Sequence, residues 1–170
     1  MFSREQFHQH MNLWKNYEKT YKKMLKEKPQ GDREWNKNFL YNREGYLLHN
    51  FFFGQFADDP SGIGPLLSSQ IRKDFGSISQ WRKVFSEMAA GCRPAGWAIL
   101  CWSNIDGKLT HILADDHTEF GLDMHIILIL DMYEHAYFID YGSDKKQYIQ
   151  DFLDQVDYQI AEERLAYLID

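Results

Sequence analysis

The residues with the clearest capacity for chemistry are Asp131 and His135, together with two remote histidines, His10 and His49. If Asp131 ends a strand and His135 opens the following helix, both side chains can face one point. One carboxylate with three imidazoles suits a single iron or manganese ion, whereas zinc takes similar ligands but favours thiolates in its structural sites. The sequence therefore offers a candidate mononuclear metal site.

Bringing His10 and His49 together requires two helices, which the apolar periodicity predicts over residues 3–28 and 33–56. The run 28–32 between them contains a proline and a glycine, and both oppose helix continuation. The midpoint between the two histidines falls in this run. An antiparallel hairpin therefore brings them level, because each helix rises about 1.5 Å per residue. The turn does not fix which face each histidine occupies, and surface positions for one or both are the alternative.

The rest of the chain predicts an α+β fold, in which the N-terminal antiparallel helical hairpin is followed by an α/β lobe with a small three-stranded antiparallel sheet. We expect a hairpin lobe over residues 1–74 and the α/β lobe over 75–170, sharing one metal site. The further helices are expected at 66–74, Ile78–Ala90 (capped by Ser77), 134–140 and 145–167, and the strands at 96–102, Lys108–Ala114 and His125–Leu130.

Composition narrows the class of protein. Hydrophobic residues make up 44% of the 170 residues, enough for a sizeable core, and the formal charge of −6 argues against nucleic acid as a partner. Cys92 and Cys101 give no disulfide framework and are interpreted as small buried side chains in a reduced compartment. The longest apolar run, Ile126–Leu130, is too short to span a membrane, and the N-terminus shows no charged-then-apolar leader. A soluble, cytoplasmic protein without a membrane partner is the expectation.

Several motifs, in order and spacing, resemble the iron/manganese superoxide dismutase family over nearly the whole chain. Each motif alone is weak, and their succession is what is specific. The matching segments are Asp74–Ser77 with Trp81 and Phe85, Gly96–Ala98, Gly107–Leu109, Asp131-x-x-Glu134-His135-Ala136-Tyr137, Ile139–Tyr141, and Phe152 with Val156–Tyr158. One aromatic is exchanged, since Tyr133 stands where the family has Trp.

The resemblance implies a ligand set of His10, His49, Asp131 and His135, the same four that the hairpin argument selects. It also implies one Fe or Mn ion per subunit with a solvent molecule as fifth ligand, and disproportionation of superoxide, the small-molecule substrate. A homodimer is implied as well, in which Glu134 reaches the metal-bound histidine of the partner.

The sequence departs from the family where the metal potential is tuned and where substrate enters. The family places a glutamine near the bound solvent at one of two positions, either on the second helix or just before the strand. Here these two positions hold Gly45 and Arg93. Arg93 is a candidate for supplying positive charge near the metal, and its alternative is an exposed side chain paired with a carboxylate. The arginine of the substrate funnel aligns with Lys145, which keeps the charge but changes the geometry.

The gateway residues differ too. The family's gateway tyrosine aligns with Glu18, next to Tyr17, while its gateway histidine aligns with Trp14 and its tyrosine from the partner subunit with Phe138. Tyr17, Arg93, Glu134 and Lys145 are therefore the candidate catalytic residues beside the four ligands. Two functions remain open: a divergent dismutase, or a metal-binding dismutase-like protein with little activity and a structural or assembly role.

Other classes fit less well. A zinc hydrolase would need Glu134 or Glu18 as its general base, and a di-iron bundle would need two Glu-x-x-His motifs, of which only Glu5-x-x-His8 occurs. The remaining histidines are expected to be surface or loop residues: His8, His111, His117 and His125. His117 lies in an acidic loop that we interpret as solvated.

Overall fold

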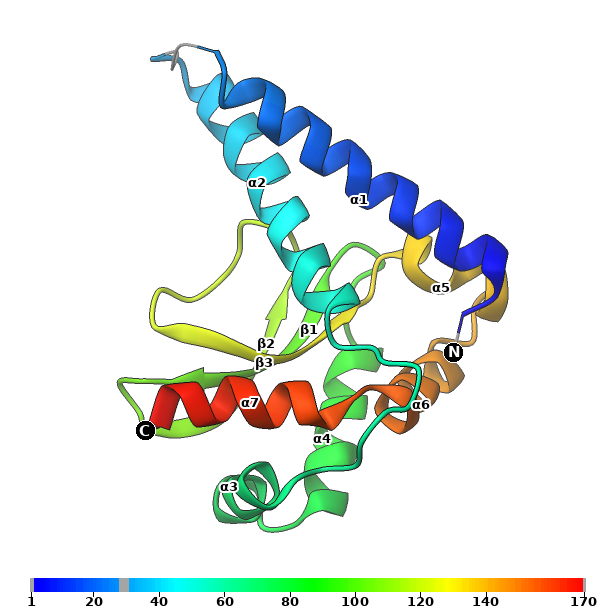
Figure 1. Cartoon of the computed structure of the whole chain (residues 1–170), viewed down its shortest axis with the longest axis vertical. Helices are drawn as coiled ribbons and strands as arrows, with labels where there is room; N and C mark the ends of the chain where they lie inside the picture. The colour runs from blue at the N-terminus through cyan, green and yellow to red at the C-terminus, as the bar shows by residue number, and fades with distance from the viewer. Residues whose placement is uncertain (1, 28–30, 170) are drawn as a thin grey trace.

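The computed structural model describes residues 2–27 and 31–169 and has the predicted α+β architecture (Figure 1). Its elements follow one another as α1 (Arg4–Met24), α2 (Arg33–Phe53), α3 (Pro65–Phe75), α4 (Ile78–Ala90), β1 (Trp97–Ser103), β2 (Lys108–Ala114), β3 (Met124–Asp131), α5 (Glu134–Tyr141), α6 (Lys145–Gln155) and α7 (Tyr158–Ile169). The bounds of α4 and β2 are those predicted from sequence.

Helices α1 and α2 form the predicted antiparallel hairpin, which projects from the body of the molecule (Figure 1). Each begins at a side-chain cap: Ser3 accepts a hydrogen bond from the backbone N–H of Gln6, and Asp32 accepts one from that of Trp35. Both helices end a few residues earlier than predicted. Of the predicted turn, residues 28–30 lie outside the described residues.

The sheet has strand order β2-β1-β3, and both pairs are antiparallel. Strand β1 is buried along its whole length, because β2 and β3 flank it and helices cover it. In the register, Trp97 pairs with Ala114 on one side and with Asp131 on the other. The start of β1, the end of β2 and the end of β3 therefore meet at one end of the sheet.

Strand β3 lies at the edge of this sheet, and side chains satisfy its outward backbone groups. The side-chain amide of Gln55 donates to the carbonyl of Ile129 and accepts from the N–H of the same residue at 3.1 Å. Arg164 donates to the carbonyl of Ile127 at 3.1 Å. This cover leaves little free edge for another strand to pair with, and it fastens the end of α2 to β3.

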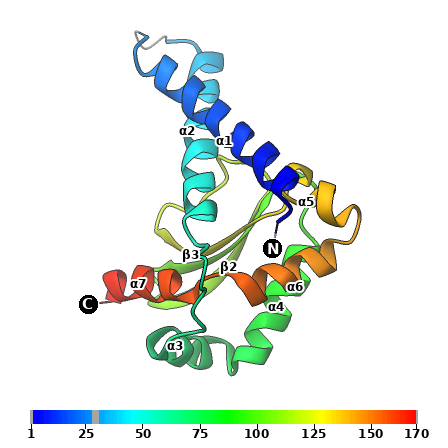
Figure 2. The same ribbon diagram turned by 45° about the vertical axis from the view of Figure 1, so that its right-hand side comes forward.

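Helices cover the sheet and complete the core. Contacts join α4 to β1 and β2, α3 to β2, and α7 to β3, as Figures 1 and 2 show from two directions. Trp81 and Phe85 of α4 are fully buried in this layer. Helix α3 also packs on α4 and α7. The division into lobes at residue 74 stays a prediction.

The prediction of a single helix over residues 145–167 is wrong. Helix α6 ends at Gln155, and a separate helix, α7, begins at Tyr158. Val156 is extended, and the carboxylate of Asp157 accepts from the backbone N–H of Ser61 at 3.0 Å and of Gln159 at 3.1 Å. The N–H of Asp157 donates to the carbonyl of Gln55 at 3.0 Å. The break is thus stabilised by a loop that lies about a hundred residues earlier in the sequence.

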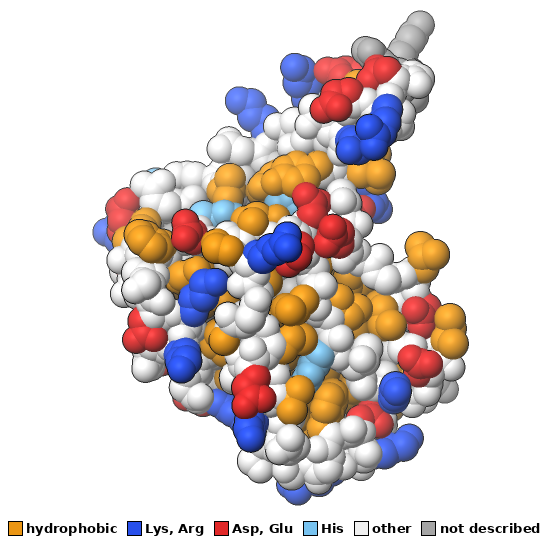
Figure 3. Space-filling model, turned by 180° about the vertical axis from the view of Figure 1, so that it is seen from behind, with side chains coloured by type: hydrophobic (Ala, Val, Ile, Leu, Met, Phe, Trp, Pro, Cys, Tyr) orange, Lys and Arg blue, Asp and Glu red, His pale blue; other side chains and the backbone are white. Residues whose placement is uncertain are grey.

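The distribution of surface charge and the burial of the two cysteines bear on the predictions made from composition. Figure 3 shows acidic and basic side chains mixed on one face, with no broad region of a single sign. Cys92 and Cys101 are buried and unbridged. In the part of the chain that the structure describes, no helix combines the length and apolar character needed to cross a bilayer.

Candidate metal centre

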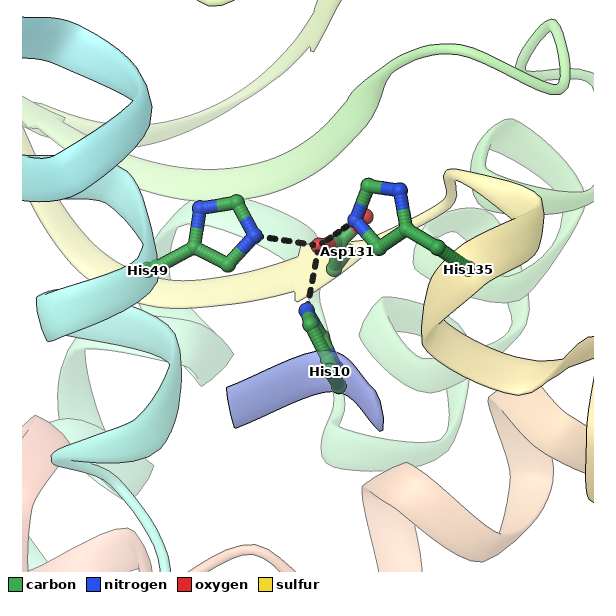
Figure 4. Close-up of side chains that lie close together, drawn as sticks. All are labelled: His10, His49, Asp131 and His135. Atoms are coloured by element: carbon green, nitrogen blue, oxygen red, sulfur yellow. Dashed lines mark hydrogen bonds and ion pairs between the residues drawn. The ribbon is translucent and has the colours of Figure 1, made fainter. Parts of the chain in front are cut away.

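Three imidazoles converge on one carboxylate oxygen where α1, α2, β3 and α5 meet (Figure 4). The Nε2 atoms of His10, His49 and His135 lie 3.1, 3.5 and 3.2 Å from Oδ2 of Asp131. The four candidate ligand atoms all lie within 4.8 Å of one another. As the sequence predicts, Asp131 ends β3, α5 starts three residues later, and the hairpin brings His10 level with His49.

The protonation of His49 shows what this arrangement is suited to bind. Its Nδ1 lies 2.6 Å from the carbonyl oxygen of Gly45, which only accepts, so Nδ1 carries the proton and Nε2 presents a lone pair. That Nε2 is buried, has no hydrogen-bond partner, and faces the Asp131 carboxylate. Two acceptors facing each other in a buried site are reconciled by a cation between them. The donor set fits a ferrous, ferric or manganese ion.

The electrostatics favour the deprotonated, metal-binding forms. Burial lowers the pKa of His49 to about 3, and burial also lowers the pKa of His10 despite the neighbouring carboxylate. Burial is the largest single influence on the pKa of Asp131 and acts to raise it, but the charges and hydrogen bonds of His135 and His10 together outweigh burial, so the pKa lies well below the ordinary range. At neutral pH the site therefore combines the negative charge of Asp131 with the uncharged imidazoles of His10 and His49.

Hydrogen bonds to the surrounding backbone hold the ligands in place. The second oxygen of Asp131 accepts from the N–H of Tyr133 at 2.9 Å, and its main-chain carbonyl accepts from the hydroxyl of Tyr148 at 2.8 Å. Gln6, fully buried in α1, donates to the carbonyl of His135 at 2.6 Å and accepts from the N–H of Ile139 at 3.1 Å. Gln6 thus fixes α1 against α5, and with them their two histidine ligands.

His117 lies in a loop, as the sequence predicts, but the prediction that it is solvated is wrong: it is 1% exposed and lies beside the four ligands. The indole N–H of Trp97 donates to its Nδ1 at 2.9 Å, so Nε2 carries the proton and donates to the hydroxyl of Tyr17 at 3.0 Å. Burial lowers the pKa of His117 to about 4, which keeps it neutral. The rings of Tyr17 and His117 lie 5.3 and 6.0 Å from that of His49.

The glycine at position 45 makes room for this arrangement. A Cβ atom there would lie 2.9 Å from Cδ1 of Tyr17 and 3.1 Å from Cδ2 of His117. The volume that a side chain at this helix position would occupy is therefore filled by Tyr17 and His117. The sequence signal for His117 was its position three residues after the predicted strand Lys108–Ala114, whose last residue pairs with Trp97 in the structure.

The other candidate catalytic residues, Arg93, Lys145 and Glu134, lie outside the group of four candidate ligands. The side chain of Arg93 is 79% exposed, with its Nε 3.6 Å from the Asp115 carboxylate, and that of Lys145 donates to the carbonyl of Cys92 at 3.1 Å. Neither belongs to the metal-binding group. Glu134 is exposed and shares a surface pocket with His135, whose side chain is 27% exposed.

The two residues at the gateway positions, Trp14 and Phe138, lie in different surroundings. The indole N–H of Trp14 donates to the side chain of Asn50 at 2.9 Å, and its ring stacks on Tyr46. Phe138 lies 54% exposed in the pocket that reaches His135. The polar pair that the family resemblance implied for these positions is thus replaced by two aromatic side chains on different elements.

A helical hairpin joined to a small antiparallel sheet, with a three-histidine, one-aspartate group between them, defines a mononuclear metalloprotein. Residues 64–164 match the model of the iron/manganese superoxide dismutases, C-terminal domain. The chain is 33% identical over 164 residues to "Superoxide dismutase [Mn] 1" of Halobacterium salinarum, covering 91% of this chain and 78% of that protein. This protein belongs to the iron/manganese superoxide dismutase family.

Other relatives are named for iron instead of manganese. "Superoxide dismutase [Fe]" of Methanothermobacter thermautotrophicus is 34% identical over 140 residues, covering 78% of this chain and 67% of that protein. "Superoxide dismutase [Fe]" of Cupriavidus metallidurans is 35% identical over 121 residues, covering 71% and 61%. The chain spans about three fifths of the length of several of the relatives that it matches.

Proposed function

We propose that this chain disproportionates superoxide at a single iron or manganese ion held by His10, His49, Asp131 and His135. The observation that carries the proposal is the buried lone pair of His49 facing the Asp131 carboxylate, in a chain of this family. When bound, the ion supplies the one-electron redox chemistry. One superoxide gives up an electron and leaves as dioxygen, while a second gains that electron and two protons and leaves as hydrogen peroxide.

The protein's own residues position the reaction and supply protons. The pocket beside His135 reaches the exposed edge of the metal-binding group, so we assign it to superoxide entry. Tyr17 and His117 are the hydrogen-bonded pair next to His49 and can hold a proton at the Tyr17 hydroxyl. The proposal leaves Arg93 and Lys145 outside this chemistry, as general contributors of positive charge.

We further propose a homodimer and a cytoplasmic location. Glu134, Phe138 and Ile139 are exposed around the pocket at His135, and a second copy placed there would let Glu134 meet the partner subunit's His135. Two buried, unbridged cysteines support a reducing compartment. The net charge of −6 gives nucleic acid no general attraction.

The test is superoxide consumption by protein reconstituted separately with iron and with manganese, alongside His135→Ala. Activity that needs the metal and disappears in the variant supports the proposal and identifies the metal. Tight binding of iron or manganese without superoxide consumption would favour the dismutase-like protein with a structural role. Full occupancy by zinc alone would contradict the redox function.

A further inference from the structure

Helix α1 carries a row of basic side chains along one face. Arg4, Lys15, Lys19 and Lys22 are exposed, and their helical spacing places them within about 60° of one another around the helix axis. Lys26 is exposed in the turn that follows the helix. From Arg4 to Lys22 the row extends over about 27 Å, because a helix rises about 1.5 Å per residue.

The basic row lies on the side of α1 that faces away from the protein. The buried residues of this helix are Gln6, His10 and Met24, which the helical spacing places on the opposite side. Helix α1 packs on α2 and α5, and it forms one edge of the projecting hairpin (Figure 1). A large partner can therefore approach the row along the length of the helix.

The charge of this segment is opposite to that of the whole chain. Residues 4–27 contain six Lys or Arg and three Glu, a net charge of +3, whereas the chain carries −6. Glu18 accepts from Lys22 at 2.6 Å, but Lys15 and Lys19 have no ion-pair partner in the part of the chain that the structure describes. The outer face of α1 thus attracts an anionic partner, while the rest of the surface repels it.

Exposed apolar side chains lie beside the basic row near both ends of the helix. Phe7 and Leu25 are 48% and 56% exposed, and they are eighteen residues apart, so five helical turns bring them to the same direction. Leu25 is the C-cap residue and keeps helical backbone angles.

A hollow of about 920 Å³ opens beside Phe7, with Arg4 and Asp58 at its edge. Its apolar lining comes from Phe2, Phe7, Met11, Phe53 and Phe56. Basic and apolar groups therefore share one face at the N-terminal end of α1, which suits a partner that is anionic at its surface and apolar below it.

We propose that the outer face of α1 docks on an anionic lipid bilayer, with Lys15 and Lys19 at the headgroups and Phe7 and Leu25 entering the boundary with the acyl chains. The apolar side chains favour a bilayer over nucleic acid, because a phosphate backbone gives them nothing apolar to contact. The net charge of −6 is an average over the chain that conceals this face. Peripheral attachment of this kind needs no membrane-spanning helix and does not depend on superoxide chemistry.

The first test is co-sedimentation of the full chain with vesicles of phosphatidylcholine, either alone or mixed with phosphatidylglycerol. We expect binding to the mixed vesicles only, and its loss at high salt. Lys15→Gln with Lys19→Gln should weaken binding by about 25-fold, since each basic residue near an anionic surface contributes about fivefold. Lys73→Gln with Lys146→Gln, at exposed positions of α3 and α6, changes the net charge equally and should bind as the parent does. Equal binding by the two double variants, or no binding by the parent, would overturn the proposal.

The second test separates a bilayer from other polyanions. Leu25→Ser should weaken binding to the mixed vesicles by several fold, whereas Ile105→Ser, at an 83% exposed position in the turn between β1 and β2, should not. Unchanged vesicle binding in Leu25→Ser would overturn the insertion on which the choice of a bilayer depends. A parent chain that binds a duplex oligonucleotide through Lys15 and Lys19, but not the mixed vesicles, would also overturn the proposal and favour nucleic acid.

Discussion

A side chain at Gly45 would begin 2.9 Å from Cδ1 of Tyr17, so the α2 backbone and the Tyr17 ring lie in direct contact. The same Cβ atom would lie 3.1 Å from His117. The missing side chain on α2 and the buried imidazole from the loop after β2 therefore belong to one arrangement. A change at either position should be felt at the other.

We expect Gly45→Ala to displace Tyr17 or His117. The tight contact should cost about 1–3 kcal/mol of unfolding free energy, from which the better helix propensity of alanine recovers up to about 1 kcal/mol. Urea unfolding and superoxide turnover measure the two effects. Gly62→Ala is the control, because a Cβ atom at Gly62 meets nothing within 4 Å. Unchanged turnover in Gly45→Ala would contradict the contact.

Replacing His117 should separate proton supply from metal binding. His117→Ala removes the hydrogen bonds to Trp97 and Tyr17, and we expect turnover to fall by about 10²-fold while metal content per subunit is retained. His117→Gln, whose amide can accept from Trp97 and donate to Tyr17, should recover part of the loss. Metal analysis and stopped-flow kinetics on the same samples provide the measurement. Loss of the metal in His117→Ala would place His117 among the ligands.

Sequence reasoning brought the four candidate ligands together because short-range signals fixed the position of each. The breakers between the two long helices set His10 level with His49, and the spacing from Asp131 to His135 suited a strand-to-helix junction. Periodicity likewise predicted α4 and β2 to the residue. In each case the information lay within one element or one turn.

The surroundings of the site were missed because they depend on contacts between remote segments. His117 is in an acidic loop that looks solvated, and only the pairing of Trp97 with Ala114 brings it beside the ligands. The break at Val156 interrupts a helical pattern, and it is stabilised by Ser61 and Gln55 rather than by local residues. Such positions follow from the pairing of remote segments, which local sequence patterns do not determine.

The stability of the metal-free protein should fall as the pH is lowered from about 6.5 to about 4. Burial lowers the pKa of His111 and of His117 to about 4, so between these values the unfolded chain binds more protons than the folded one. Stability therefore rises with pH through this window, by up to about 1.4 kcal/mol per pH unit for each group. Urea midpoints at several pH values measure the slope.

A pair of variants separates the buried groups from exposed ones in that titration. His111 packs against Phe75 and has a buried Nε2 without a hydrogen-bond partner, so His111→Leu should flatten the slope by one group's share. His8→Gln, which replaces an exposed histidine of α1, is the control variant. Equal slopes in the parent and in His111→Leu would show that His111 does not titrate as described.

Gln55 should contribute more to the free energy of unfolding than a side chain with one hydrogen bond. Its amide bonds to both the backbone N–H and the carbonyl of Ile129 at the edge of the sheet. Gln55→Leu has a similar volume but leaves a buried N–H and a buried carbonyl without partners, at a cost of about 1–3 kcal/mol for each. The same change loosens the end of α2 against β3, and thus His49 against Asp131, so we expect weaker metal binding as well as a lower urea midpoint. Gln150→Leu, at an exposed position of α6, is the matched control and should change neither quantity. A lower midpoint with unchanged metal affinity would show that His49 is positioned without the Gln55 bridge.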